Sequence, residues 1–200
     1  MIRAVEKVRE RLQRAVTALE GAGVPYAIAG GNAVAAWVAR VDESATRKTP
    51  DVDILIDRSE FERARGALEG VGLHHRPAAG TEIFLDGPDA PVRHAVHVLI
   101  ANERVRESDA LPTPAVSEAE DGPSFRYVTL SALVRMKLTS FRLKDRVHIL
   151  DLIEVGLVDE TARAGLPPEL VARLDELLET RAPKSPTAAG SANGLPRDPD

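Results

Sequence analysis

The sequence predicts an α/β fold of the α+β kind, with a short mixed sheet covered by helices and a helical region after it. Two observations favour this class. Helical and strand-like patterns alternate through the first half of the 200 residues. Aromatic residues make up only 4% of the chain, so Ala, Val, Leu and Ile must build the core. Such a composition favours helices packed on a short sheet over an all-β sandwich.

Hydrophobic periodicity places the individual elements. Apolar residues recur every three or four positions in the predicted helices, which cover 2–20, 32–40, 60–68, 129–155 and 167–181. The fourth of these is expected to break near Arg142, and Ser59 with Glu62 forms a capping-box pattern at the start of the third. Short apolar or alternating runs predict strands over 24–30, 51–57, 81–87 and 93–101. Residues 102–125 are polar and contain proline, which predicts a loop.

The same patterns divide the chain into three parts. Residues 1–128 are expected to form the core, and 129–181 a helical C-terminal region that closes a cleft. Residues 182–200 are rich in Pro, Ala, Gly and Ser without apolar periodicity, which predicts a disordered tail.

Composition excludes several classes of function. The net charge of −5 argues against broad, non-specific binding to nucleic acid, although it leaves room for one local basic patch. The absence of cysteine excludes disulfides, thiolate metal sites and a cysteine nucleophile. No apolar run approaches the ~20 residues that cross a bilayer, and the charged N-terminus does not resemble a signal peptide. A cytoplasmic protein without membrane contact is expected.

Two short segments carry the chemistry. Gly30-Gly31 lies between a predicted strand and a predicted helix, where free N–H groups and the helix dipole suit a phosphate. Asp51 and Asp53 lie two apart on the next strand, so their side chains share a face with Cα atoms about 6.6 Å apart. Two such carboxylates are typical Mg²⁺ ligands beside substrate phosphates. Arg47 is expected to reach a phosphate and Thr49 to brace the loop by hydrogen bonding.

The stretch YAIAGGNAVAAW followed by RKTPDVDILID resembles the nucleotidyltransferase superfamily, which has the polymerase-β-like fold. It is most similar to small bacterial members, including the abortive-infection and type IV toxin-like branch. The resemblance implies that Gly30 and Gly31 contact the triphosphate and that Asp51 and Asp53 bind the catalytic Mg²⁺. A weaker resemblance in LSALVRMKLTSFRLKDRVHILDL implies that Lys137 faces the nucleotide. Lys144, seven residues later, would share a face with Lys137 on a continuous helix and counter the triphosphate charge.

The sequence departs from this family at the expected third carboxylate. The corresponding run, AVHVLIAN, carries His97 at that position, and imidazole is a poor ligand for Mg²⁺. Three interpretations follow: His97 acts as a general base, Glu82 or Asp86 on the preceding strand replaces the missing carboxylate, or the protein binds nucleotide without transferring it.

Two hypotheses about function result. In the first, the protein is a Mg²⁺-dependent enzyme that transfers a nucleoside monophosphate from an NTP to an acceptor hydroxyl on a tRNA end, a protein or a small molecule. In the second, it is a catalytically degenerate module that binds a nucleotide or a protein partner, as one component of a toxin–antitoxin pair.

Overall fold

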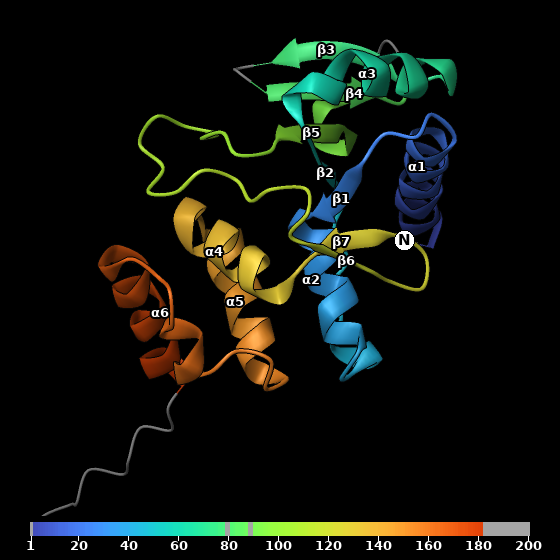
Figure 1. Cartoon of the computed structure of the whole chain (residues 1–200). Helices are drawn as coiled ribbons and strands as arrows, with labels where there is room; N and C mark the ends of the chain where they lie inside the picture. The colour runs from blue at the N-terminus through green and yellow to red at the C-terminus, as the bar shows by residue number, and fades with distance from the viewer. Residues whose placement is uncertain (1, 79–80, 88–89, 182–200) are drawn as a thin grey trace, which may run out of the picture.

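A seven-stranded mixed sheet forms the centre of the protein in a computed structural model that describes residues 2–78, 81–87 and 90–181 (Figure 1). The strand order is β3-β4-β5-β2-β1-β7-β6. The strands are β1 (Tyr26–Ala29), β2 (Val52–Ile56), β3 (His74–Ala78), β4 (Thr81–Leu85), β5 (Val96–Ile100), β6 (Ala119–Asp121) and β7 (Arg126–Val128). Strand β2 pairs with β5 in parallel and with β1 antiparallel, which places it at the centre of the sheet.

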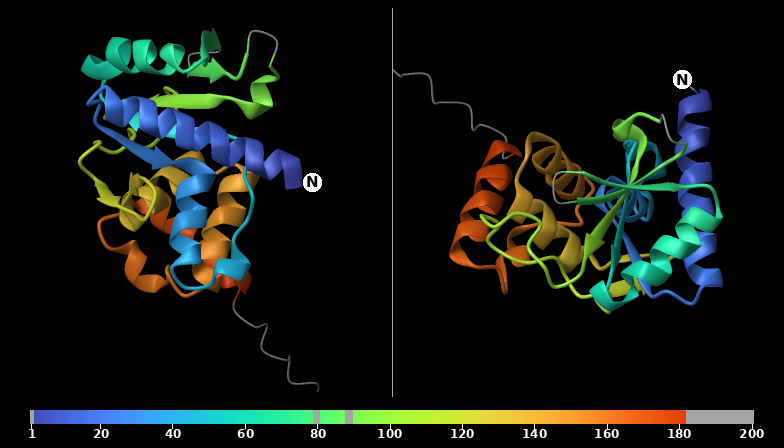
Figure 2. Two further views of the ribbon diagram at one scale, coloured as in Figure 1. Left: turned by 90° about the vertical axis from the view of Figure 1, so that its right-hand side faces the viewer. Right: turned by 90° about the horizontal axis from the view of Figure 1, so that it is seen from above.

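Helices cover both faces of this sheet (Figure 2). Helices α1 and α3 pack together on one face, while α2 packs on β1 and β2 from the other. Helices α4 and α5 pack against α2, and α6 packs outside them both. Their bounds are α1 (Ile2–Gly21), α2 (Gly30–Ala39), α3 (Phe61–Gly70), α4 (Leu130–Ser140), α5 (Leu143–Glu154) and α6 (Pro168–Arg181). The predicted class, a mixed sheet covered by helices with a helical C-terminal region, is confirmed.

Strand register brings polar residues together at the centre of the sheet. Asp53 on β2 lies beside Ala29 of β1 on one side and beside His97 of β5 on the other. Neighbours in register project from the same face of a sheet, so Asp53 and His97 emerge side by side. This is the face covered by α2, which begins at Gly30 immediately after β1.

Three short strands escape the sequence prediction. Strand β3 lies at one edge of the sheet, and β6 and β7 form the other side within a stretch predicted mostly as loop. Strands β6 and β7 have three residues each, too short for a period-2 pattern to stand out. Strand β3 contains Pro77, which lacks a backbone N–H and is confined to edge strands.

Two local predictions about helix ends are wrong. The helix predicted over 32–40 begins two residues earlier, so Gly30 and Gly31 form its first turn instead of preceding it. The capping box at Ser59 does not form: a 3-10 turn occupies Arg58–Glu60, and α3 begins at Phe61 with no side-chain cap.

The expected break near Arg142 is confirmed, since α4 ends at Ser140 and α5 begins at Leu143. Phe141 between them has the left-handed conformation with φ 43°, which bulky residues rarely adopt. Arg146 and Arg173 lie over its ring, and Arg173 also donates to the carbonyl oxygens of Leu138 and Thr139. Because the helix is not continuous, the idea that Lys137 and Lys144 share one helical face is wrong.

Within the described residues, no helix combines the length and the apolar composition that crossing a bilayer requires. The tail predicted over residues 182–200 lies outside the described part of the chain.

Candidate active site

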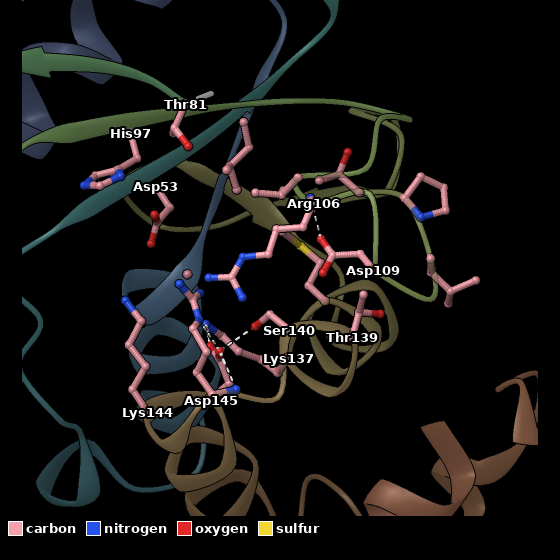
Figure 3. Close-up of a pocket in the computed structure, with 18 of the residues that line it drawn as sticks. Asp53, Thr81, His97, Arg106, Asp109, Lys137, Thr139, Ser140, Lys144 and Asp145 are labelled. Carbon is pink, nitrogen blue, oxygen red and sulfur yellow. Dashed lines mark hydrogen bonds and ion pairs between the residues drawn. The ribbon is translucent and has the colours of Figure 1, made fainter. Parts of the chain in front are cut away.

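A cavity of about 340 Å³ opens where β2, β5 and the start of α2 meet α4, the start of α5 and the loop after β5 (Figure 3). Asp51, Asp53 and His97 line it together with Gly30 at the start of α2. Figure 3 shows Asp53 and His97 at one end, with Lys144 across from them. Six of the residues singled out in the sequence therefore lie around one cavity: Gly30, Asp51, Asp53, His97, Lys137 and Lys144.

Both glycines are required by the close approach of neighbouring side chains. Gly30 has φ +62°, and a Cβ there would lie 2.6 Å from Cγ of Asp53 and nearer still to its Oδ2. A Cβ on Gly31 would lie 2.8 Å from both Cβ and Oγ1 of Thr49. The pair thus allows the Asp53 carboxylate and the Thr49 side chain to pack directly on the first turn of α2. Gly30 lines the cavity, whereas Gly31 and Thr49 do not.

Asp51 precedes β2 and is fixed through its backbone. Asn32, in the first turn of α2, donates from Nδ2 to the Asp51 carbonyl oxygen at 2.8 Å. Oδ1 of Asp51 is buried and has no hydrogen-bond partner. Burial raises the pKa of Asp51, and the charge of Asp53 adds to this, while His97, Lys144 and His94 oppose it. A buried carboxylate oxygen without a partner beside a second carboxylate is an environment that a cation stabilises.

His97 lies on β5, where the family resemblance led us to expect a third carboxylate. It lies in register with Asp53 and lines the same cavity, and its Nε2 is buried without a hydrogen-bond partner. An imidazole nitrogen in this state has the capacity to accept or donate one proton.

Neither carboxylate proposed to replace the missing one is available, so that interpretation is wrong. Glu82 lies in register with Val98, one residue beyond His97, and therefore projects from the opposite face of the sheet. There it contacts Nε2 of His75 at 2.6 Å. Asp86 is bound by Arg14 and Arg11 of α1 and does not line the cavity.

A cluster of charged residues where α4 meets α5 forms the floor of the cavity. Asp145 is fully buried; it accepts from Lys137 Nζ at 3.0 Å and from Arg142 Nε at 2.9 Å, and the Ser140 hydroxyl also donates to it. Burial alone would raise the pKa of Asp145, but Lys137 and these hydrogen bonds lower it to about 2. Lys137 lines the cavity, and its charge is paired with Asp145.

His148 lies behind this cluster on α5. Burial and the charge of Lys137 lower the pKa of His148 to about 4, against the opposing effect of Asp145 and Asp151. Its Nδ1 is buried without a hydrogen-bond partner. His148 is therefore neutral at physiological pH.

The cavity carries equal numbers of acidic and basic side chains: Asp51, Asp53, Asp109 and Asp145 against Arg106, Lys137, Arg142 and Lys144. Lys137 and Arg142 pair with Asp145. Neither Arg106 nor Lys144 forms an ion pair with any described residue, so both remain available to an anionic ligand. Arg47, expected to reach a phosphate, instead donates to Asp151 at 2.7 Å and does not line the cavity.

Asp51 and Asp53 fit one Mg²⁺ ion. Mg²⁺ binds through one or two carboxylates together with waters and substrate phosphates, and the unpartnered Oδ1 of Asp51 is a ligand of the required kind. No group of three or more His, Asp or Glu side chains in the described part of the chain is arranged to hold a metal by itself. The remaining ligands would have to come from water and nucleotide.

Sequence reasoning missed the contribution of the loop between β5 and β6. Arg106 and Asp109 enter the cavity from this loop, and Arg106 extends across it (Figure 3). Ser140 and Thr139 at the end of α4 also line it. Local pattern carried no signal for the loop residues, because their position depends on how the loop folds back over the sheet.

No protein-family model matches the sequence, and no curated protein is similar to it in sequence. Solved structures are similar in fold. An antigenic nucleotidyltransferase-like protein from Paracoccidioides brasiliensis superimposes with a TM-score of 0.55 at 17% identity, over 88% of this chain and 89% of that one. The chain has the nucleotidyltransferase fold. The antibiotic-resistance factor ANT(2'')-Ia superimposes less well, with a TM-score of 0.48 at 14% identity over 86% of this chain and 82% of that one.

The nucleotidyltransferase fold agrees with the resemblance drawn from the Gly-Gly and Asp-x-Asp segments. His97 lies on β5 in register with Asp53, at the point where the sequence differs from the family that it resembles. Since fold alone does not specify activity, function has to be argued from the side chains of the cavity.

Proposed function

We propose that this protein is a Mg²⁺-dependent nucleotidyltransferase that transfers a nucleoside monophosphate from an NTP to an acceptor hydroxyl. The observation that carries the proposal is the composition of one cavity: two adjacent carboxylates, Asp51 and Asp53, face two basic side chains without ion-pair partners, Arg106 and Lys144. An anionic ligand that brings a divalent cation satisfies both sets at once. An NTP is such a ligand.

Each group has a definite task in this proposal. Asp51 and Asp53 hold the cation, which when bound neutralises charge on the triphosphate. Lys144 and Arg106 bind phosphate oxygens, and the first turn of α2 directs N–H groups and its positive dipole end toward them. Lys137 and Arg142 both pair with the one carboxylate of Asp145, so this cluster keeps a net positive charge beside the phosphates. Catalysis rests mainly on positioning and electrostatic stabilisation, as in other phosphoryl transfers.

His97 is the proposed general base. The acceptor oxygen forms a bond to the α-phosphorus while the bond from that phosphorus to the bridging oxygen of the β-phosphate breaks, and pyrophosphate leaves. The proton of the acceptor hydroxyl passes to Nε2 of His97, which has no other hydrogen-bond partner.

A second candidate function follows from the same residue. If the histidine beside Asp53 cannot replace a carboxylate in catalysis, the protein binds nucleotide without transferring it. It then acts through a protein partner, as one component of a toxin–antitoxin pair. His97 is the specific observation that favours this alternative, because it replaces a carboxylate in the family pattern.

The test uses an α-labelled NTP with Mg²⁺ and three acceptor pools: tRNA, cell protein and a small-molecule extract. If His97 is the base, His97→Ala should lower transfer about 10²- to 10⁴-fold while NTP binding is retained. His74→Ala, at an exposed histidine on the edge strand β3, serves as the matched control and should leave transfer unchanged. Product formed only by His97→Asp would favour the degenerate alternative. Absence of NTP binding by the unaltered protein would contradict both.

A further inference from the structure

The cavity has a second end that the triphosphate does not explain. Figure 3 shows Asp109 and Thr139 together at the end away from Asp53 and His97, with the Arg106 side chain extending between the two ends. If phosphates occupy the end with Asp51 and Asp53, the rest of the nucleotide points toward Asp109. The inference below rests in this respect on the proposed function.

The loop that carries Asp109 is held in place at its base. Thr113 is buried; its N–H donates to the Glu103 carbonyl oxygen at 2.9 Å, and its Oγ1 donates to the Ile100 carbonyl oxygen at 2.5 Å. Within the loop, the Arg106 N–H donates to Oδ2 of Asp109 at 2.9 Å. This bond fixes the Asp109 carboxylate relative to Arg106, so one loop supplies both a cation directed along the cavity and an acceptor at its end.

The walls around Asp109 suit a flat, mostly apolar ring. Leu111 and Pro112 line the cavity from the loop, and Met136 lines it from α4, one turn before Thr139. A thioether makes favourable contacts with aromatic rings. Oγ1 of Thr139 is buried and without a hydrogen-bond partner, so this end also offers one unused polar atom. Apolar walls with few convergent polar groups are typical of sites that read a nucleobase by its edge.

We propose that this end of the cavity is a nucleobase subsite and that Asp109 selects guanine. An ionised carboxylate only accepts hydrogen bonds. Guanine presents two adjacent donors, N1–H and the 2-amino group, which one carboxylate binds in a bidentate manner. Adenine and cytosine present one amino group beside an acceptor nitrogen, and uracil presents one N–H between two carbonyl groups. A carboxylate therefore forms two hydrogen bonds with guanine alone. With each of the other bases, one carboxylate oxygen would face an acceptor atom of the base, and their lone pairs would repel.

Calorimetric titration with GTP, ATP, CTP and UTP in the presence of Mg²⁺ tests this assignment. GTP should bind about 5- to 150-fold more tightly than the other three, the discrimination expected of one bidentate pair. Inosine triphosphate keeps N1–H but lacks the 2-amino group, so its affinity should lie between those of GTP and ATP.

Asp109→Asn is expected to weaken binding of GTP and to strengthen binding of another nucleotide. Its amide offers one acceptor and one donor, which match xanthine, where a carbonyl group replaces the 2-amino group. The variant should lose the preference for GTP and bind xanthosine triphosphate more tightly than the unaltered protein does. Glu107→Gln removes an exposed carboxylate from the same loop outside the cavity and should change neither preference.

The outcomes separate this inference from the function on which it rests. Similar affinities of the unaltered protein for all four NTPs would overturn the base subsite and leave the proposed function standing. An equal loss of affinity for all four NTPs in Asp109→Asn would also overturn the base subsite. Asp109 would then act on the phosphates or on the structure of the loop, and not on the base. If no NTP binds at all, the proposed function itself fails.

Discussion

Replacement of Gly30 by alanine tests how closely the first turn of α2 and the Asp53 carboxylate depend on each other. Gly30 has φ +62°, a conformation that costs a residue with a Cβ about 1–2 kcal/mol. The added Cβ would also lie 2.6 Å from Cγ and 2.9 Å from Cβ of Asp53, with Oδ2 closer still. Relief of such overpacking costs about 1–3 kcal/mol. We therefore expect Gly30→Ala to lower the free energy of unfolding by about 2–5 kcal/mol.

Urea unfolding with an unchanged m value measures this loss, and NTP titration measures the displacement of Asp53. Asp53→Ala removes the two nearest atoms of the clash, so Gly30→Ala should cost at least about 1 kcal/mol less in that background. Gly66→Ala is the control: Gly66 is exposed in the middle of α3, and no atom lies within 4 Å of its added Cβ. This control should be stabilising by about 0.5–1 kcal/mol. A Gly30→Ala variant within about 0.5 kcal/mol of the unaltered protein, with intact NTP binding, would show that Asp53 does not pack on the first turn of α2.

Three further predictions concern stability. The pKa of Asp145 is about 2 against an ordinary 3.8, so its ionised form stabilises the fold by about 2 kcal/mol above pH 4, and this is lost as the pH falls toward 2. Asp145→Asn should lose this stabilisation at neutral pH. Denaturation at several pH values should show the difference in unfolding free energy between the variant and the unaltered protein shrinking in acid. The pKa of His148 is about 4 against 6.5, so as the pH falls the unfolded chain is protonated before the folded one, and stability decreases between pH 6.5 and 4. His148→Gln should reduce this decrease in melting temperature across a pH series. An unchanged dependence of melting temperature on pH would contradict the prediction. Arg47 is 61% exposed, so Arg47→Ala should change the unfolding free energy by less than about 1 kcal/mol and should leave NTP affinity unchanged. A large loss of NTP affinity in this variant would mean that Arg47 leaves Asp151 to bind phosphate.

Local sequence was sufficient to predict the central part of the site. The order of strand, Gly30-Gly31, helix and Asp-x-Asp placed Asp51 and Asp53 near the glycines, and the structure brings Gly30 into contact with Asp53. The family resemblance also predicted His97 on a strand beside Asp53, and the structure pairs the two residues in register.

The rest depended on contacts between residues far apart in the chain. The pairing of Arg47 with Asp151 joins positions 104 residues apart, and nothing in either segment indicates it. The side of the sheet on which Glu82 lies depends on the register of β4 against β5, and a shift of one residue reverses it. Arg106 and Asp109 reach the cavity from a loop whose base is closed by hydrogen bonds of Thr113 to Glu103 and Ile100.

Calorimetric titration with NTPs, with and without Mg²⁺, of the unaltered protein and of Asp53→Asn shows whether Asp51 and Asp53 form a magnesium–nucleotide site. This substitution keeps the shape of the side chain and removes its charge. Binding should require Mg²⁺ and should disappear in Asp53→Asn, while Asp57→Asn, just beyond the end of β2 and outside the cavity, should bind as the unaltered protein does. Binding that persists without Mg²⁺, or that survives Asp53→Asn unchanged, would contradict a magnesium–nucleotide site at Asp51 and Asp53.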